Sequence, residues 1–363
     1  MIVVVKVGTS SITDEQGEIA RAAVDKLCSE VAHLRDRGDR VVVVSSGAIA
    51  AGLPALGLSG AAAVDVATLQ AASAVGQSRL MRVYDELLGQ RGLVGGQVLL
   101  APLDFVHRSQ YLHARTTLGR LLELGVVPVV NENDAVADDE IRFGDNDRLA
   151  ALVANLVAAD VLVLLTDAPG VLDRDPRLHD EGSLIEEIVE VDSVLDNVAG
   201  GPGSWRGSGG MASKLAAAKM AAWSGVRVVI AGADRPGVVE GVVRGVPGMG
   251  TVVPARPRRL SARKLWIAFA VGKSGTIVVD EGARRALEER HSSLLPAGVV
   301  DVVGSFDADD AVEICDTSGR VFAKGLCQLA AKVLREVAGR RTAELPEGLP
   351  HEVVHRDDLV TLP

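Results

Sequence analysis

Aromatic residues and cysteines are scarce in this sequence. Phe, Trp and Tyr together make up 3 % of the 363 residues, so the interior has to be built from Val, Leu, Ile and Ala. A core of that kind suits helices that pack on a buried parallel sheet. The three cysteines, Cys28, Cys315 and Cys327, are odd in number and form no CxxC pair. We therefore expect free thiols in a reducing compartment.

An excess of positive charge is also absent. The 38 Lys and Arg are outnumbered by 48 Asp and Glu, and the formal net charge of −10 gives no global attraction to nucleic acid or an anionic membrane. The opening residues MIVVVKVG lack the basic and long apolar regions of a signal peptide. No apolar run reaches the roughly 18–20 residues that cross a bilayer. These features predict a cytoplasmic protein that does not enter a membrane.

A regular alternation of apolar runs and helical stretches fills the first part of the chain. The runs are short, β-branched and without polar alternation, which favours strands buried on both faces. They are Ile2–Val5, Val41–Val44, Val94–Leu100, Val126–Val130, Val161–Leu165 and Val226–Ile230. Helical spacing occurs between them, for example at Ala20–Asp36 and Asp147–Ala159. The pattern predicts an open, mainly parallel α/β sheet sandwiched by helices, with active-site loops at the carboxyl ends of the strands.

The pattern changes near residue 248, and the length also favours two domains. Gly248–Lys264 contains two prolines and four arginines and is interpreted as a linker. We assign residues 1–255 to a catalytic domain, 256–264 to the linker and 265–363 to a second domain. Short strands and one helix near Ala330–Ala338 predict a small β-barrel or sandwich there. The expected strands are Gly275–Asp280, Gly298–Val303, Ala311–Asp316, Arg320–Gly325 and His351–Val354.

Two lysines are placed where they can contact phosphate groups. Lys6 ends the first apolar run and is followed by Gly8, so its ammonium group can lie over a phosphate bound at that turn. Lys214 ends the glycine-rich segment Gly207–Lys214, which leads into an expected helix at Leu215–Trp223. Glycines let the backbone approach phosphates, and a helix N-terminus adds partial positive charge. Lys6 could equally be a surface lysine at the end of a strand. The first apolar run alone does not decide between this role and a phosphate contact.

Polar residues follow three other apolar runs and open one expected helix. These segments are Ser45–Ala48, Asn131–Asp134, Gly144–Asp147 and Thr166–Gly170. Hydroxyl and backbone N–H groups at a helix start can bind an anion. Asn and Asp together can accept from an α-ammonium group and donate to a carboxylate, which is what an amino-acid substrate needs. Capping and turn formation also explain each segment when it is taken alone.

Two further motifs are not expected to be functional. His351–His355 matches the HExxH pattern of zinc proteases, which requires both histidines on one face of a helix. Pro350 and the paired valines favour a strand instead. Gly272–Ser274 resembles the end of a P-loop, but Ile267 stands where that motif needs glycine.

Taken together and in order, the motifs of the first domain resemble those of the amino acid kinase family, and within it the enzymes that act on free glutamate. The resemblance rests on VVKVGTSS at Val4–Ser11, SSGAIAAG at Ser45–Gly52, SAVGQSRL at Ser73–Leu80, PVVNENDAV at Pro128–Val136, FGDNDRLAAL at Phe143–Leu152 and GSGGMASKL at Gly207–Leu215. The second domain is similar to PUA domains, with VDEGA at Val279–Ala283 and SSLLPAGV at Ser292–Val299.

The resemblance implies a role for each matching position. Lys6 and Lys214 would contact the phosphates and stabilise the transferred group, and Asp147, with Asp145, would hold the two lysines. Glutamate would be bound by Ser46, Asp134 and Asn146. The nucleotide would be bound by Lys6, Thr166, Asp167, Ser208, Gly209, Gly210, Met211, Ala212, Ser213 and Lys214. No protein ligand for a metal is implied.

The resemblance also implies a reaction and partners. ATP with Mg²⁺ would phosphorylate the side-chain carboxylate of L-glutamate to L-glutamyl 5-phosphate, the first step of proline biosynthesis. A homo-oligomer (dimer or tetramer), feedback inhibition by proline and a glutamyl phosphate reductase as partner are expected as well. The alternatives are a relative with aspartate, N-acetylglutamate, carbamate or UMP as acceptor, and an RNA-binding protein on a kinase scaffold.

The second domain departs from the expected pattern. Ala323–Leu329 reads AKGLCQL where a more polar segment with Arg and Tyr is expected. Residues 265–363 contain 11 Lys and Arg against 16 Asp and Glu, a net charge of −5. This balance argues against RNA binding driven by phosphate contacts.

Overall fold

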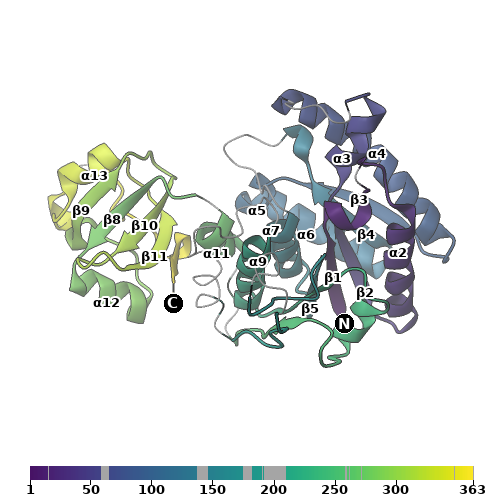
Figure 1. Ribbon diagram of the computed structural model, residues 1–363. Coiled ribbons are helices and arrows are strands. Elements are labelled where there is room, and N and C mark those ends of the chain that lie inside the picture. Colours follow the sequence, from purple (N-terminus) through teal and green to yellow (C-terminus); the bar gives the residue numbers. More distant parts are fainter. Residues whose placement is uncertain are drawn as a thin grey trace. The chain divides into compact units, whose positions relative to one another are not determined.

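The chain forms two compact units, Met1–Leu260 and Ser261–Pro363 (Figure 1). The computed structural model describes residues 1–14, 16–58, 65–136, 146–174, 182–189, 191, 210–257, 260, 262–270, 272–346 and 348–362. Within these ranges, no helix combines the length and the apolar character that crossing a membrane requires.

A seven-stranded sheet forms the centre of the first unit, in the order β3-β4-β2-β1-β5-β6-β7. All neighbouring strands pair in parallel except β6 and β7. The strands are β1 (Ile2–Val7), β2 (Arg40–Ser45), β3 (Gly95–Leu100), β4 (Val127–Glu132), β5 (Val161–Thr166), β6 (Arg227–Gly232) and β7 (Thr251–Val253). The first six confirm the strands expected from apolar runs. The interpretation of Gly248–Lys264 as a linker is wrong for β7, whose three residues are too few to show a period.

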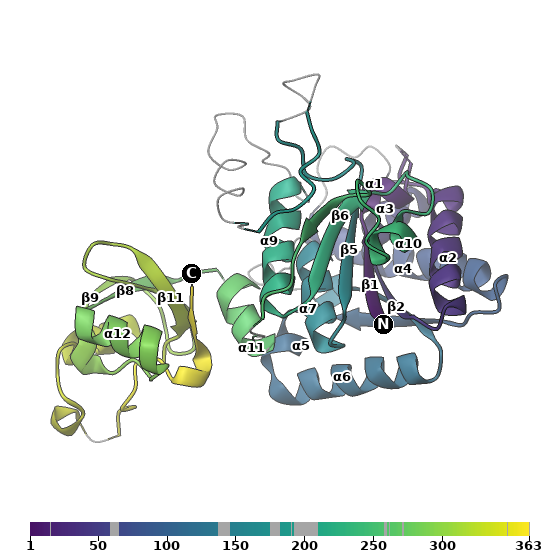
Figure 2. The same ribbon diagram turned by 90° about the horizontal axis from the view of Figure 1, so that it is seen from below.

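Helices cover both faces of this sheet (Figure 2). One face is covered by α2 (Arg21–Asp36), α4 (Val66–Gly89) and α10 (Val238–Val243), and the other by α6 (Arg108–Glu123), α7 (Asn146–Leu156) and α9 (Met211–Trp223). The described part of the unit also contains three shorter α-helices: α1 (Thr9–Ile12), α3 (Ala48–Ala55) and α5 (Leu103–Val106). The open sheet sandwiched by helices that the sequence predicts is therefore present.

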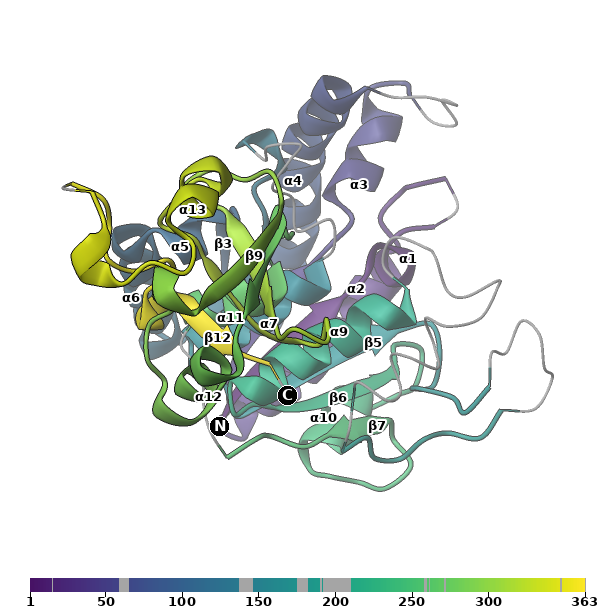
Figure 3. The same ribbon diagram turned by 90° about the vertical axis from the view of Figure 1, so that its left-hand side faces the viewer.

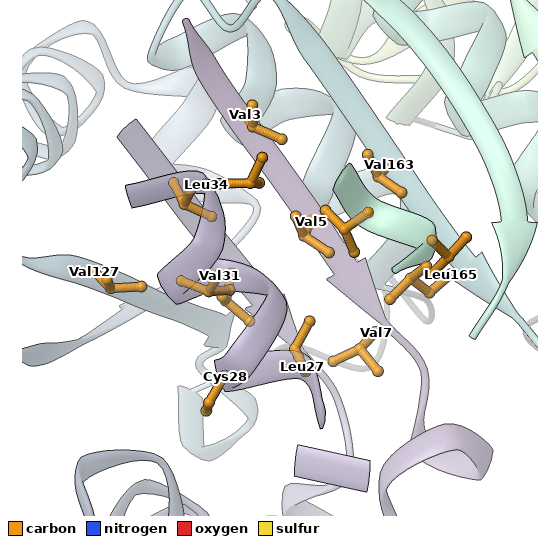
Figure 4. Packing of buried hydrophobic residues seen from close by; sticks show 14 of the residues in the cluster. Val3, Val5, Val7, Leu27, Cys28, Val31, Leu34, Val127, Val163 and Leu165 are labelled. Carbon is orange, nitrogen blue, oxygen red and sulfur yellow. The ribbon is translucent and has the colours of Figure 1, made fainter. Parts of the chain in front are cut away.

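Alternate side chains of the central strand build the core on the α2 face. Val3, Val5 and Val7 of β1 pack toward Leu27 and Val31 of α2, as Figure 4 shows. Because side chains of a strand alternate between its two faces, the residues between these valines point toward α7 and α9. Lys6 is one of them, which places its side chain on the same face as α7 and α9.

The second unit contains a five-stranded sheet in the order β12-β11-β10-β8-β9. Its strands are β8 (Gly275–Val279), β9 (Val299–Gly304), β10 (Ala311–Cys315), β11 (Val321–Leu326) and β12 (Leu359–Thr361). Its helices are α11 (Ala262–Leu265), η2 (Trp266–Ala270), α12 (Glu281–Arg290) and α13 (Ala331–Val337), and α13 was expected from the sequence. The β-rich character of this unit is as predicted.

One expected strand of the second unit is wrong. Within His351–Val354 only Val354 pairs, in an isolated bridge with Leu294, and β12 forms later in the chain. The segment is not helical either, so His351 and His355 do not share a helix face as the zinc-protease pattern requires.

Candidate active site

Four parallel strands of the first sheet end in buried polar residues at the same edge. The strands β4, β2, β1 and β5 are neighbours in that order. Lys6, Ser45, Asn131 and Thr166 occupy one of the last two positions of these strands, and all four are buried. Open α/β sheets bind their ligands at this carboxyl edge.

Two lysines contact the same buried carboxylate. Lys6 Nζ lies 2.6 Å from one carboxylate oxygen of Asp147, and Lys214 Nζ lies 3.2 Å from the other. Asp147 is fully buried near the start of α7, and the two lysines are 3 % and 6 % exposed. Removing one partner of such a buried pair costs roughly 3–5 kcal/mol because it leaves an uncompensated charge. We call these three residues the lysine cluster.

The described part of the glycine-rich segment places Lys214 in the first turn of a helix. Gly210 is the N-cap of α9, in extended conformation, and Met211, Ala212 and Ser213 precede Lys214 within the helix. The first N–H groups of a helix have no partner within it and can bind an anion. Ser208 and Gly209, which the sequence assigns to nucleotide binding, lie outside the described residues, as does Asp145.

Next to the lysine cluster, the side-chain amide of Asn146 joins two strand ends. Its Nδ2 donates to Ser46 Oγ at 2.9 Å, to Asn131 Oδ1 at 2.8 Å and to the Ser45 carbonyl at 3.3 Å. Asn131 Oδ1 also accepts from the backbone N–H of Glu132 at 2.8 Å. We call Ser46, Asn131 and Asn146 the amide cluster. Since Asn146 and Asp147 are consecutive, the two clusters are adjacent at the start of α7.

The acceptors around Asn146 settle the direction of its amide. Three acceptor atoms surround Nδ2, so its carbonyl oxygen Oδ1 points away from them. This Oδ1 atom is buried and has no hydrogen-bond partner in the part of the chain that the structure describes. A buried polar atom without a partner costs roughly 1–3 kcal/mol, and ligands are one way of satisfying it. The oxygen is therefore available to accept from a ligand N–H group.

Asp134, the third residue assigned to glutamate, is held by helix α4. Its Oδ2 accepts a hydrogen bond of 2.6 Å from the hydroxyl of Ser73, which is itself buried. Asp134 opens the short 3₁₀ turn η1 (Asp134–Val136) directly after β4. The structure thus places Asp134 close to the end of the strand that contains Asn131.

Close packing of two helices positions Ser73. Helices α3 and α4 lie side by side (Figures 1 and 3) and approach through two glycines. A Cβ at Gly52 would lie 1.8 Å from the Ala72 carbonyl oxygen, and one at Gly76 would lie 1.7 Å from that of Ala48. Such distances are impossible for a real Cβ, so only glycine permits this contact. The glycines of the SSGAIAAG and SAVGQSRL motifs therefore have a packing role.

A buried tyrosine fixes the end of β2 from the other side. Tyr84 of α4 is fully buried, and its hydroxyl lies 3.0 Å from Ser45 Oγ. Burial raises the pKa of Tyr84 well above its usual value, so the phenol stays protonated at neutral pH. Ser45 is thus held by Tyr84 through its side chain, while its carbonyl accepts from Asn146.

Thr166 and Asp167 line a cavity at the end of β5. Thr166 Oγ1 donates to Asp167 Oδ1 at 2.9 Å. The cavity measures about 350 Å³ and is also lined by Ser10, Lys26 and Asp234. Its hydroxyl and carboxylate groups suit a ligand with several hydroxyl and amine groups.

The structure brings most of the predicted site residues to one edge and adds others. Lys6 and Lys214 both contact Asp147, and Ser46 contacts Asn146. Asp134 follows the end of β4 and Thr166 is the last residue of β5, two strands that β2 and β1 separate in the sheet. Sequence reasoning assigned no role to the individual residues Ser45, Ser73, Asn131 and Tyr84. For Ser73 and Tyr84 the signal was available, because both are polar groups on the apolar face of a helical pattern.

Comparison with known proteins identifies the family of each unit. The sequence model of the Amino acid kinase family matches residues 1–232. The chain belongs to the amino acid kinase family. The PUA domain model matches residues 275–349, so the second unit contains a PUA domain. The fold predicted from the sequence is thereby confirmed for both units.

Curated relatives resemble the chain over its full length. "Glutamate 5-kinase" of Caldanaerobacter subterraneus subsp. tengcongensis is 41 % identical over 366 residues, covering 100 % of this chain and 98 % of the relative. "Glutamate 5-kinase" of Gloeobacter violaceus is 46 % identical over 367 residues, covering 99 % of each. Among solved structures, isopentenyl phosphate kinase of T. acidophilum matches 70 % of this chain and 100 % of its own, with 18 % identity and a TM-score of 0.48.

Proposed function

We propose that the chain transfers the γ-phosphoryl group of ATP to the side-chain carboxylate of L-glutamate, giving L-glutamyl 5-phosphate and ADP. Full-length similarity to curated glutamate 5-kinases supports this acceptor. The structural observation that supports the chemistry most strongly is the lysine cluster, which lies directly beside the amide cluster. The reaction would be the first step of proline biosynthesis.

The chemistry needs charge stabilisation rather than a general base. The side-chain carboxylate of glutamate is already ionised at neutral pH and is the nucleophile. One of its oxygens attacks the γ-phosphorus, the bond from that phosphorus to the β–γ bridging oxygen breaks, and ADP leaves. Negative charge spreads over the transferred oxygens in the transition state. Positioned cations in a buried site stabilise that charge without reorganising.

The lysine cluster supplies these cations. Lys6 and Lys214 would contact the phosphate oxygens, and Asp147 is a positioning residue that holds both ammonium groups at one point. The N-terminal N–H groups of α9, next to Gly210–Ser213, add partial positive charge. Thr166 and Asp167, with the segment that contains Ser208 and Gly209, would bind the remainder of the nucleotide.

The acceptor would be bound by the other side of the site. Asp134 Oδ2 and the unpaired Oδ1 of Asn146 are acceptors suited to the α-ammonium group of glutamate. The hydroxyl of Ser46, held by Asn146, can donate to the carboxylate that reacts.

Magnesium would enter as part of the nucleotide substrate. Asp147 is engaged with both lysines, and the described residues contain no group of three His, Cys, Asp or Glu side chains that could hold a metal ion. Phosphate oxygens are ligands that Mg²⁺ prefers in kinase sites, where the ion neutralises charge on the transferred group. The protein side of the site then binds the complex through Lys6 and Lys214.

Formation of glutamyl hydroxamate tests the proposal. Purified protein is incubated with MgATP, hydroxylamine and L-glutamate, with aspartate, N-acetylglutamate and carbamate run in parallel and UMP followed by ADP release. We expect hydroxamate from L-glutamate and at most a few per cent of that rate from the other acceptors. Turnover of a different acceptor alone contradicts the proposed substrate. If no acceptor gives hydroxamate or ADP, the result favours the RNA-binding alternative. A salt-dependent RNA titration then tests that alternative.

Further expectations from the sequence remain predictions. They are a dimer or tetramer, feedback inhibition by proline, delivery of the product to a glutamyl phosphate reductase and a cytoplasmic location. RNA binding is not part of the proposal, because residues 265–363 have a net charge of −5.

A further inference from the structure

We propose that Gln77 of α4 binds the α-carboxylate of the amino-acid substrate and so helps to select L-glutamate. The proposal rests on the proposed function. It assigns a role to a residue outside the lysine cluster, the amide cluster and the Ser73–Asp134 pair.

Gln77 contains a buried donor that no described residue satisfies. The residue is 8 % exposed, and its Oε1 accepts a hydrogen bond of 3.1 Å from Gln97 Nε2 of β3. That contact directs the other end of the amide, Nε2, away from Gln97. Gln77 Nε2 is buried and has no hydrogen-bond partner among the described residues. An unpaired buried N–H group costs stability, and a ligand that accepts from it explains why such a group is kept.

The position of Gln77 on its helix places it beside the expected substrate. Ser73 and Gln77 are four residues apart, so they share one face of α4 with Cβ atoms about 6 Å apart. Ser73 binds Asp134, the acceptor for the α-ammonium group in the proposed function. The α-carboxylate is attached to the same carbon atom as that ammonium group. A donor one helical turn from Ser73 is therefore at the right separation to reach it.

The described side chains of the amide cluster and Asp134 offer few donors for a second carboxylate. The Nδ2 group of Asn146 already donates to three acceptors, and the free atom of that amide is an acceptor. Asp134 is also an acceptor. L-glutamate has two carboxylates and one ammonium group, so it needs more donors than acceptors. Two N–H bonds of Gln77 supply what is missing, and hydrogen bonds to a charged group are among the stronger ones.

The test measures L-glutamate and two analogues with the native protein and with Gln77→Leu. This substitution removes the amide and keeps a similar side-chain volume. L-glutamate is compared with 4-aminobutyrate, which lacks the α-carboxylate, and glutarate, which lacks the α-ammonium group. Each compound is measured as a substrate and as a competitive inhibitor, so a compound that binds without reacting still gives a constant. Gln90→Leu, at the far end of the same helix and exposed, is the matched control.

The expected result is selective. Gln77→Leu should lower kcat/KM for L-glutamate about 10- to 100-fold, mainly through KM, and should weaken glutarate similarly. The constants for 4-aminobutyrate and for ATP should change less than about twofold, because neither involves the α-carboxylate. Gln77→Glu places a second anion there and should weaken L-glutamate further. The midpoint of thermal unfolding should change little in Gln77→Leu, since the substitution removes an unpaired buried N–H group together with one hydrogen bond to the exposed Gln97.

Three outcomes overturn the inference. Unchanged constants for L-glutamate show that Gln77 does not bind it. Equal losses for L-glutamate and 4-aminobutyrate show a structural role, and a loss for 4-aminobutyrate but not for glutarate assigns Gln77 to the ammonium group instead. If the native protein does not phosphorylate L-glutamate, both this inference and the proposed function are contradicted. If the native protein is active and Gln77→Leu leaves its constants unchanged, this inference alone is contradicted.

Discussion

On the proposed phosphate side of the site, Lys6 and Lys214 both contact Asp147. On the proposed acceptor side, the buried amides of Asn146 and Gln77 each keep an atom that no described residue pairs with. The phosphate side forms its ion pairs within the protein itself. Among the described residues, the acceptor side has an unpaired oxygen on Asn146 and an unpaired N–H group on Gln77. We infer that the first is preorganised for charge and that the second is completed by its ligand. Substitutions on each side test whether the two sides act independently.

Removing a cation should have the largest effect. Lys214→Met keeps the apolar stem of the side chain and deletes the charge in the first turn of α9. We expect kcat to fall on the order of 10²–10³-fold, as for the loss of one electrostatic group at the transferred oxygens. The KM for L-glutamate should change little. Steady-state kinetics checks this, with Lys219→Met on the same helix as control; equal losses in the two variants would show that α9 is merely disturbed.

Removing the carboxylate that holds both lysines should have a slightly smaller effect. Asp147→Asn preserves the shape of the side chain but weakens its hold on Lys6 and Lys214. Displacement of catalytic groups by about 1 Å can cost on the order of 10²-fold in rate. We expect a loss of that size in kcat, with normal circular dichroism. The exposed Asp85→Asn change serves as control, and a kcat near the native value would remove the positioning role of Asp147.

Removing the amide next to Asp147 should act on the other side. Asn146→Leu deletes the hydrogen bonds to Ser46 and Asn131 together with the unpaired oxygen. We expect the KM for L-glutamate to rise about 10- to 100-fold, while the KM for ATP stays within about twofold. Kinetics with each substrate varied in turn gives both constants. A matching rise in the KM for ATP would mean that the two sides are not separate.

The smallest expected effect on chemistry comes from the packing that supports the acceptor side. Gly76→Ala must push α4 away from the Ala48 carbonyl, which should destabilise the protein by about 1–3 kcal/mol. Urea unfolding measures this. Gly89→Ala, in the last turn of the same helix, has open space around the new methyl group and should be neutral or stabilising. Equal free energies of unfolding in both variants would contradict the close approach of α3 and α4.

Sequence patterns predicted the parts of this molecule whose signal is local. The first six strands are apolar runs, and the helix expected at Leu215–Trp223 is present as α9, which already begins at Met211. The strand Thr251–Val253 was not predicted, because three residues between Gly250 and Pro254 are too few to show a periodic pattern. Helix α12 should have been found, since Asp280 accepts from the Ala283 N–H and good helix formers follow. His351–Val354 was misassigned because paired valines favour a strand wherever they occur.

The contacts within the site depend on tertiary structure and were less accessible. Nothing local indicates that Gly52 and Gly76 meet, or that Ser73 reaches Asp134 across 61 positions of sequence. The unpaired atoms of Asn146 and Gln77 can be recognised only once all neighbouring donors and acceptors are placed. Sequence patterns thus predicted several of the candidate site residues, and the structure adds Ser73 and Gln77 and the contacts among them.

Asn146 and Asp147 offer the most direct test of the division into two sides, because consecutive residues are assigned to opposite sides. Binding of L-glutamate is measured by calorimetric titration of the native protein, Asp147→Asn and Asn146→Leu under the same conditions. The account predicts that Asp147→Asn binds L-glutamate within about threefold of the native affinity, and that Asn146→Leu binds it about 10- to 100-fold more weakly. Equal loss of binding in the two variants, or a loss in Asp147→Asn alone, would contradict the separation of a phosphate side from an acceptor side.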